Sequence, residues 1–132
     1  MTDIENNEEG KYFVYADRKR LYQILDNLIG NAIKFSNSGA RINISVKKVK
    51  DNHGQNEKSK QVIVSVTDRG KGISQKVMPN LFERFTTDSE YGTGLGLFIA
   101  RKLIEAHGGK IWAFNNKDDK GATFEFSLPL LD

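Results

Sequence analysis

Hydrophobic residues recur at helical spacing in two segments of the chain. The first covers residues 18–35, where apolar side chains return every three or four positions, as on one face of an α-helix. Asp17 stands directly before it, and Asp is a favoured N-cap residue. The second segment follows Gly94 and ends at Gly108 and Gly109, which are typical of a helix C-terminus. The pattern therefore predicts two amphipathic helices.

Other segments are rich in β-branched and aromatic residues, and several alternate between hydrophobic and polar positions. This alternation is typical of strands that bury one side. The predicted strands cover residues 11–16, 41–49, 61–67, 110–115 and 122–128. A polar loop joins the second of these to the third, which favours an antiparallel hairpin. Residues 73–85 are predicted to form a short helical segment that Pro79 interrupts.

The predicted order is strand, helix, two strands, a loop region, helix and two strands. Hairpins favour an antiparallel or mixed sheet, and amphipathic helices must cover one face of that sheet to bury their apolar sides. We therefore expect an α+β fold: a two-layer α/β sandwich with a mixed, mostly antiparallel sheet and helices on one face. The 132 residues suit a single domain, 1–132, because they can form one modest core.

Composition excludes several classes of function. The chain has no Cys, which rules out a disulfide scaffold, a thiol nucleophile and a thiolate metal site. Its net charge of +3 comes from mixed acidic and basic residues, so we expect no nucleic-acid partner. No apolar run approaches the ~20 residues of a membrane span, and the polar start does not resemble a signal peptide. We expect no membrane contact by this domain and a cytoplasmic location.

A polar strip runs along the first predicted helix, opposite its apolar face. Gln23, Asn27, Asn31 and Lys34 follow one another at helical spacing. Asn is a poor helix former, and the two Asn flank Gly30, which is poorer still. An Asn oxygen suits Mg²⁺, and a Lys one turn further on suits phosphate. The strip is therefore a candidate metal and phosphate site, with an ordinary solvated surface as the equal alternative.

Asp68 follows a buried-looking strand and opens the sequence D-R-G-K-G-I. Two Gly residues in such a loop allow backbone to approach a flat ligand closely. A carboxylate accepts a hydrogen bond from the exocyclic amine of adenine and repels the oxygen that guanine has at that position. The segment therefore predicts recognition of ATP rather than GTP, unless Asp68 only begins an ordinary turn.

A glycine-rich sequence, G-T-G-L-G at residues 92–96, precedes the second predicted helix. Backbone N–H groups at a helix start favour anions such as di- or triphosphates. The spacing differs from G-x-x-x-x-G-K-[ST] and from G-x-G-x-x-G, so it indicates neither of these two phosphate-binding loops. A phosphate role here needs independent support.

Four segments in one order supply that support. LDNLIGNAIKFS resembles the N box of histidine kinase catalytic domains, DRGKGI the G1 box, LFERF the F box, and GTGLGLFIARKLIEAHGG the G2 box with its helix. The resemblance extends from about Asp17 to Pro129 and places the chain with the GHKL superfamily. It implies a Bergerat-type ATP-binding fold, with ATP and Mg²⁺ as ligands and phosphoryl transfer to histidine as the reaction.

The resemblance also implies roles for individual residues. Asn31 would bind Mg²⁺, with Asn27 and Lys34 at the phosphates, and these three are the candidate catalytic residues. Asp68, helped by Thr123, would accept the adenine amine, and Phe82 and Phe85 would anchor a mobile ATP lid at residues 86–93. The remaining candidate ATP contacts are Phe35, Gly70, Gly72, Ile73, Phe85, Gly92, Thr93, Gly94, Leu95, Gly96 and Leu97. Arg84 is a further candidate phosphate contact.

Two alternatives remain open at this stage. Gyrase and chaperone ATPases of the superfamily have a water-activating Glu one turn before the metal-binding Asn, whereas this chain has Asn27 there. A second alternative is a nucleotide-sensing module that no longer transfers phosphate. In the leading interpretation, the partners are a separate dimerisation domain that bears the acceptor His and, indirectly, a response regulator. Neither His53 nor His107 lies in a segment that resembles an acceptor site.

The resemblance raises one question about the N-terminus. The family commonly has a strand before the one predicted at residues 11–16, and this chain starts too late for it. We therefore expect residues 1–10 to be disordered or to be a trimmed start.

Overall fold

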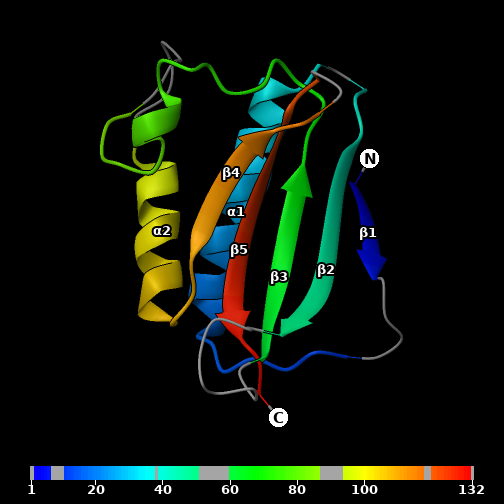
Figure 1. Cartoon of the computed structure of the whole chain (residues 1–132), viewed down its shortest axis with the longest axis vertical. Helices are drawn as coiled ribbons and strands as arrows, with labels where there is room; N and C mark the ends of the chain where they lie inside the picture. The colour runs from blue at the N-terminus through cyan, green and yellow to red at the C-terminus, as the bar shows by residue number, and fades with distance from the viewer. Residues whose placement is uncertain are drawn as a thin grey trace.

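The computed structural model describes residues 2–6, 11–37, 39–50, 60–86, 94–117 and 120–131. They form one sheet with two α-helices packed on one of its faces (Figure 1). The elements in chain order are β1 (Thr2–Asn6), α1 (Arg18–Phe35), β2 (Ile42–Lys50), β3 (Lys60–Thr67), the 3₁₀ helix η1 (Met78–Asn80), α2 (Gly96–Ala106), β4 (Ile111–Asn115) and β5 (Ala122–Pro129). The predicted α+β sandwich is confirmed.

The strand order in the described sheet is β1-β2-β3-β5-β4. β1 pairs with β2 in parallel, and the other neighbours are antiparallel, so the sheet is mixed and mostly antiparallel as predicted. Alternate residues of each strand face the helices. One buried row crosses the sheet through the paired residues Ile44, Val66 and Phe124, and Val66 is fully buried. The core therefore lies between the sheet and the two helices.

α1 begins at a well-defined N-cap and buries one face against the sheet. Asp17 is the N-cap, and its Oδ1 accepts hydrogen bonds from the backbone N–H groups of Lys19 at 2.9 Å and Arg20 at 3.3 Å. Ile24, Leu28 and Ala32 are the buried residues of the helix and face the sheet. Asn27 and Asn31 of the polar strip lie at the edge of this buried face, where Asn31 meets the ends of β3 and β5 and Asn27 meets α2.

The prediction for the N-terminal segment is wrong in two ways. Residues 11–16 are not a strand, and the strand that the chain was expected to lack is present as β1. Residues 11–16 cross the lower end of the sheet in Figure 1, with Tyr12 and Val14 half-buried and Phe13 and Tyr15 exposed. One-sided burial produces the same alternation in any extended segment, so the pattern alone could not identify a strand. Residues 1 and 7–10 lie outside the described part, which leaves their predicted disorder untested.

The helical segment predicted at residues 73–85 is much shorter in the structure. Only Met78–Asn80 form a 3₁₀ helix, and turns precede and follow it. Pro79 stands at the start of this helix, where its missing N–H costs little. The segment packs through Phe82, whose ring meets Phe124 edge-on with centroids 6.2 Å apart.

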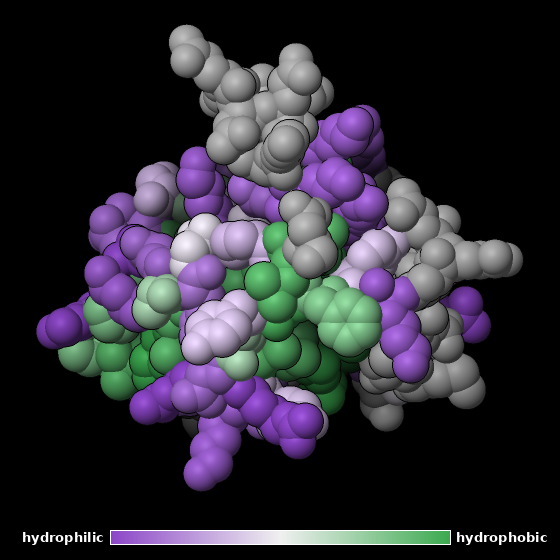
Figure 2. Space-filling model, turned by 90° about the horizontal axis from the view of Figure 1, so that it is seen from below, coloured by the Kyte–Doolittle hydropathy of each residue, from purple (hydrophilic) through white to green (hydrophobic). Residues whose placement is uncertain are grey.

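The lower end of the molecule exposes hydrophobic residues. Seen from below, they gather in a band bordered by hydrophilic residues (Figure 2). Phe13, Tyr15 and Leu131 are all exposed, and the backbone N–H of Leu131 donates to the carbonyl of Phe13 at 2.7 Å. An apolar groove of about 610 Å³ continues between residues 11–14, α1 and the sheet. None of the described helices is long and apolar enough to span a membrane.

His107 links the end of α2 to the beginning of α1. Its Nδ1 lies 2.7 Å from the carbonyl oxygen of Leu103, and its Nε2 accepts the backbone N–H of Asp17 at 3.1 Å. The neutral ring with hydrogen on Nδ1 satisfies both contacts at once. One side chain thus joins the N-cap of one helix to the C-cap of the other.

We expect His107→Ala to lower the free energy of unfolding by about 1–2 kcal/mol, because two hydrogen bonds are lost and the Asp17 N–H loses its acceptor. Urea denaturation at neutral pH measures the change. Lys110→Ala, at a nearby exposed residue, is the control and should change stability by less than about 0.5 kcal/mol. Equal stabilities for the two variants would contradict the proposed link.

Candidate functional site

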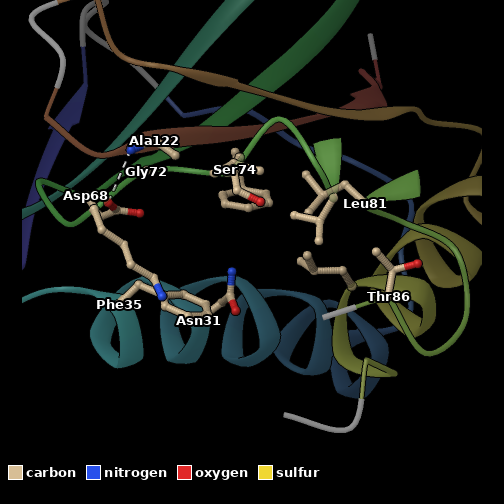
Figure 3. Close-up of a pocket in the computed structure, with 13 residues that line it drawn as sticks. Asn31, Phe35, Asp68, Gly72, Ser74, Leu81, Thr86 and Ala122 are labelled. Carbon is tan, nitrogen blue, oxygen red and sulfur yellow. Dashed lines mark hydrogen bonds between the residues drawn. The ribbon is translucent and has the colours of Figure 1, made fainter. Parts of the chain in front are cut away.

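A pocket opens between the C-terminal half of α1 and the ends of β3 and β5 (Figure 3). Asn31 extends into it from α1, and Asp68 lies across it, directly after β3. Its lining residues are Asn31, Phe35, Asp68, Lys71, Gly72, Ile73, Ser74, Val77, Leu81, Thr86, Leu97, Ala122 and Phe124. The structure therefore brings together residues from the N-box, G1-box and G2-box segments that lie far apart in the sequence.

Asp68 is a buried acidic residue with a fixed position. It is 4% exposed, and its Oδ1 accepts the backbone N–H groups of Gly70 at 2.9 Å and Ala122 at 3.2 Å. Its own N–H donates to the carbonyl of Ala122 at 2.9 Å. Oδ2 accepts no hydrogen bond from the described residues, so it remains available to a ligand. A rigid, desolvated acceptor of this kind favours a ligand with an N–H donor.

Phe35 and two lysines lie at the end of α1 on the same pocket. The Nζ atoms of Lys34 and Lys71 are 5.5 Å and 5.1 Å from the centroid of the Phe35 ring, within the range of cation–π contacts. Lys34 itself does not line the pocket but extends beside it. Lys71 does line it, and sequence reasoning missed this residue although a cation between two Gly of the G1 segment was a visible signal. Two positive charges therefore lie beside the Phe35 ring.

Asn27 lies one helical turn before Asn31, where α1 meets the start of α2. Its Oδ1 is 3.7 Å from the point that a Cβ on Gly96 would occupy. Its Nδ2 is buried and has no partner among the described residues. A buried N–H donor without an acceptor is costly, and an anionic oxygen would satisfy it. Leu97 lines the pocket from the first turn of α2, which Leu95 caps.

The loop that follows Asp68 depends on its glycines. A Cβ on Gly70 would lie 2.1 Å from the carbonyl oxygen of Phe35, so only Gly lets this loop pack on the end of α1. Gly72 has φ +79°, which side chains disfavour. Asn115 holds the next residue: it accepts the Ile73 N–H at 2.7 Å and donates to the Ile73 carbonyl at 2.9 Å. Sequence reasoning missed Asn115, because its pairing with the loop is long-range.

Asn115→Ala should weaken binding of an ATP analogue about threefold to tenfold, because both hydrogen bonds that fix Ile73 are lost at an exposed site. Isothermal titration calorimetry measures the affinity. Asn37→Ala, at an exposed Asn outside the pocket, is the matched control and should bind like the parent chain. If both variants bind equally well, the loop does not need this support.

The two ends of the predicted lid meet in the structure. The Phe85 N–H donates to the carbonyl of Gly94 at 2.8 Å, and both residues have positive φ. Phe85 is 69% exposed and does not line the pocket, so its prediction as an ATP contact is not matched by the geometry. Thr86 lines the pocket instead. Residues 87–93, with Gly92 and Thr93, lie outside the described part, and the predicted mobility is untested.

Two further candidates lie elsewhere. Thr123 faces the side of the sheet away from the helices, where its hydroxyl donates to Asn116 Oδ1 at 2.7 Å and lies 3.0 Å from the Thr67 hydroxyl. Its side chain therefore does not assist Asp68, and the prediction is corrected: Ala122 and Phe124 are the β5 residues that line the pocket. The Arg84 guanidinium lies 5.0 Å from the ring centroid of Phe98. Arg84 therefore packs against the side of α2.

Asn31 offers a single side-chain oxygen that suits Mg²⁺. The described residues contain no group of three His, Cys, Asp or Glu side chains that could hold a metal ion. Asn31 offers one neutral amide oxygen at the pocket, while the orphan Nδ2 of Asn27 is a donor and suits phosphate. Mg²⁺ commonly takes one or two protein oxygens and completes its shell with substrate phosphates and water. The residues therefore fit a Mg²⁺ ion held mainly by a bound nucleotide.

Comparison with known proteins assigns the family. Residues 16–132 match the family described as histidine kinase-, DNA gyrase B-, and HSP90-like ATPase. The sensor protein KdpD of Clostridium acetobutylicum is 42% identical over 92% of this chain and 13% of its own length. The sensor histidine kinase WalK of Bacillus subtilis is 37% identical over 96% of this chain and 20% of its own. The chain thus spans a small part of these curated relatives.

Solved structures agree with the sequence matches. A mycobacterial sensor histidine kinase, MprB, superposes with a TM-score of 0.80 at 23% identity and covers 98% of this chain and 80% of its own, which supports the fold. The catalytic domain of histidine kinase ThkA superposes with a TM-score of 0.77 at 36% identity and covers 97% of this chain and 78% of its own. The chain therefore belongs to the histidine kinase-, DNA gyrase B- and HSP90-like ATPases and is a histidine kinase catalytic domain within that family.

Proposed function

We propose that this domain binds ATP with Mg²⁺ and presents the γ-phosphoryl group for transfer to a His on a separate dimerisation domain of the same kinase. The observation behind the proposal is the single pocket that Asp68 and Asn31 line from opposite sides. Adenine would lie at Asp68, with Gly72 and Ile73 beside it. The phosphates would lie toward Asn31, Asn27 and Lys34. A response regulator would then be an indirect partner, through the phosphorylated dimerisation domain. ATP as substrate implies a cytoplasmic location.

The charge pattern supports this orientation. The free Oδ2 of Asp68 suits the amino group of the base and would repel phosphate. The orphan Nδ2 of Asn27 supplies a donor at the other end, and Lys34 and Lys71 supply positive charge beside Phe35. Phosphoryl transfer depends mainly on positioning and on neutralising the phosphate charge. Bound Mg²⁺ would supply further charge neutralisation at the phosphates, with Asn31 as its protein ligand.

Asn27 favours transfer over hydrolysis. A carboxylate at this position could remove a proton from an attacking water, and an amide cannot. ATP bound here should therefore persist until an acceptor imidazole arrives. An ATPase coupled to a conformational change is the alternative within the same family, and it requires a different base.

Incubation with ATP, Mg²⁺ and the kinase's own dimerisation domain tests the proposal. The expected product is a phosphate on the acceptor that is labile in acid and stable in base, together with slow release of inorganic phosphate from the catalytic domain alone. Rapid ATP turnover without an acceptor would favour the ATPase alternative. ATP binding without any transfer would favour a nucleotide-sensing module.

A further inference from the structure

The pairing of β3 with β5 is irregular at the point where β3 ends. Its register pairs Thr67 with Thr123, so the next residue, Asp68, stands opposite Ala122. In a regular pair at this position, the two residues exchange both backbone N–H···O=C bonds. The Asp68 N–H does donate to the Ala122 carbonyl, at 2.9 Å. The Ala122 N–H, however, donates to the carboxylate Oδ1 of Asp68 at 3.2 Å, so the Asp68 carbonyl lacks its ladder donor (Figure 3).

The side chain of Asn116 supplies the missing donor. Its Nδ2 donates to the carbonyl oxygens of Asp68 at 2.9 Å and Lys120 at 2.7 Å. Its Oδ1 accepts the Thr123 hydroxyl at 2.7 Å, which fixes the orientation of the amide. Gly121 also passes close by, because a Cβ on it would lie 2.1 Å from the same Asp68 oxygen. The Asp68 carbonyl is therefore enclosed by the turn between β4 and β5, with Asn116 as its hydrogen-bond donor.

The hydrogen bonds of the Asp68 carbonyl and carboxylate depend on each other. Because Asn116 satisfies the carbonyl, the Ala122 N–H is left to the carboxylate. Without Asn116, the carbonyl would be an enclosed acceptor without a partner, which is unfavourable. Return of the Ala122 N–H to the carbonyl would remove that cost, but Oδ1 would then lose one of its two donors. The position of Oδ2, the other oxygen of the same carboxylate, therefore depends on Asn116.

We propose that Asn116 is a positioning residue for recognition of the base. It lies 48 positions from Asp68 in the sequence and does not line the nucleotide pocket, but it holds the carboxylate by satisfying the carbonyl of the same residue. The inference rests on the proposed binding of adenine at Asp68. Asn116 also closes the turn through its own N–H, which donates to the Gly121 carbonyl at 3.0 Å. A purely structural role and a positioning role predict different effects on a base that lacks the amine.

ADP and IDP separate these two roles, because IDP has an oxygen where ADP has the amine. A fixed carboxylate attracts the amine and repels the oxygen, so the parent chain should prefer ADP. Asn116→Ala should bind ADP about tenfold more weakly than the parent chain and IDP within about twofold of it, because ADP loses a well-placed acceptor and IDP loses a repulsive contact. Isothermal titration calorimetry with the whole chain measures these affinities.

Two further variants support the comparison. Asn37→Ala, at an exposed Asn outside the pocket, is the matched control and should reproduce both parent affinities. Thr123→Val keeps the Nδ2 donor of Asn116 but removes the hydroxyl that orients it. Its affinity for ADP should fall about threefold, with no loss for IDP. This milder variant provides the test if Asn116→Ala does not fold.

The outcomes distinguish this inference from the proposed function. Equal weakening of ADP and IDP binding in Asn116→Ala indicates a purely structural role and overturns the inference. An unchanged preference for ADP in Asn116→Ala and Thr123→Val overturns it as well, while leaving the adenine site intact. A parent chain that binds ADP and IDP equally contradicts the adenine assignment itself, and the role of Asn116 falls with it.

Discussion

Replacing Asn31 with Ala is expected to reduce phosphoryl transfer to an added acceptor domain about 100-fold or more. Asn31 extends from α1 into the pocket opposite Asp68, and its amide oxygen is the one protein ligand proposed for Mg²⁺. Loss of this ligand leaves the metal held by phosphate and water alone. The single-turnover rate of acceptor phosphorylation, at saturating ATP and Mg²⁺, measures the effect.

A second readout separates the metal role from general damage to the pocket. Asn31→Ala should bind an ATP analogue in the absence of Mg²⁺ within about threefold of the parent chain, while the gain in affinity on adding Mg²⁺ is lost. Asn37→Ala is the control and should match the parent in both measurements. Transfer by Asn31→Ala at the parent rate would remove Asn31 from the proposed site.

Gly70→Ala is expected to lower the free energy of unfolding by about 1–3 kcal/mol and to abolish measurable nucleotide binding. The new methyl group would lie 2.1 Å from the carbonyl oxygen of Phe35, which belongs to the backbone of α1 and cannot rotate away. The loop must then move, and Gly72 and Ile73 move with it. Chemical denaturation and calorimetric titration with an ATP analogue measure the two effects.

Gly30→Ala, in α1, provides a matched control. A Cβ on Gly30 meets nothing within 4 Å, so the substitution should raise stability by about 0.5–1 kcal/mol through helix propensity alone. Nucleotide affinity should stay unchanged. If Gly70→Ala behaves like Gly30→Ala, the close packing of the loop on α1 is not a requirement of the site.

The sequence predicted most where the determinants are local. Residues 18–35 became α1 with the predicted bounds and N-cap, because apolar spacing and Asp17 both act within a few residues of the chain. The main elements of the sheet were also predicted, since hairpin strands are neighbours in sequence. The family resemblance predicted that Asp68 and Asn31 lie close together, and both line one pocket although they are 37 positions apart in the sequence.

The sequence predicted least where distant segments meet. β1 has a polar sequence and forms by parallel pairing with β2. The whole of α1 lies between these two strands in the sequence. Asn115 enters the site through hydrogen bonds with Ile73 that no local pattern encodes. Thr123 was a different error, because strand alternation was available: the inward residues Ala122 and Phe124 require Thr123 to face outward.

The affinity of Asp68→Asn for ATP and GTP analogues tests the central claim most directly. Asn keeps an oxygen for the Gly70 and Ala122 N–H groups but presents an N–H donor where Oδ2 was, facing the amine of adenine. The parent chain should prefer the ATP analogue, and Asp68→Asn should lose about 1–3 kcal/mol of its affinity for that analogue together with the preference. Unchanged affinity and unchanged preference, in a variant as stable as the parent, would contradict the assignment of this pocket to adenine.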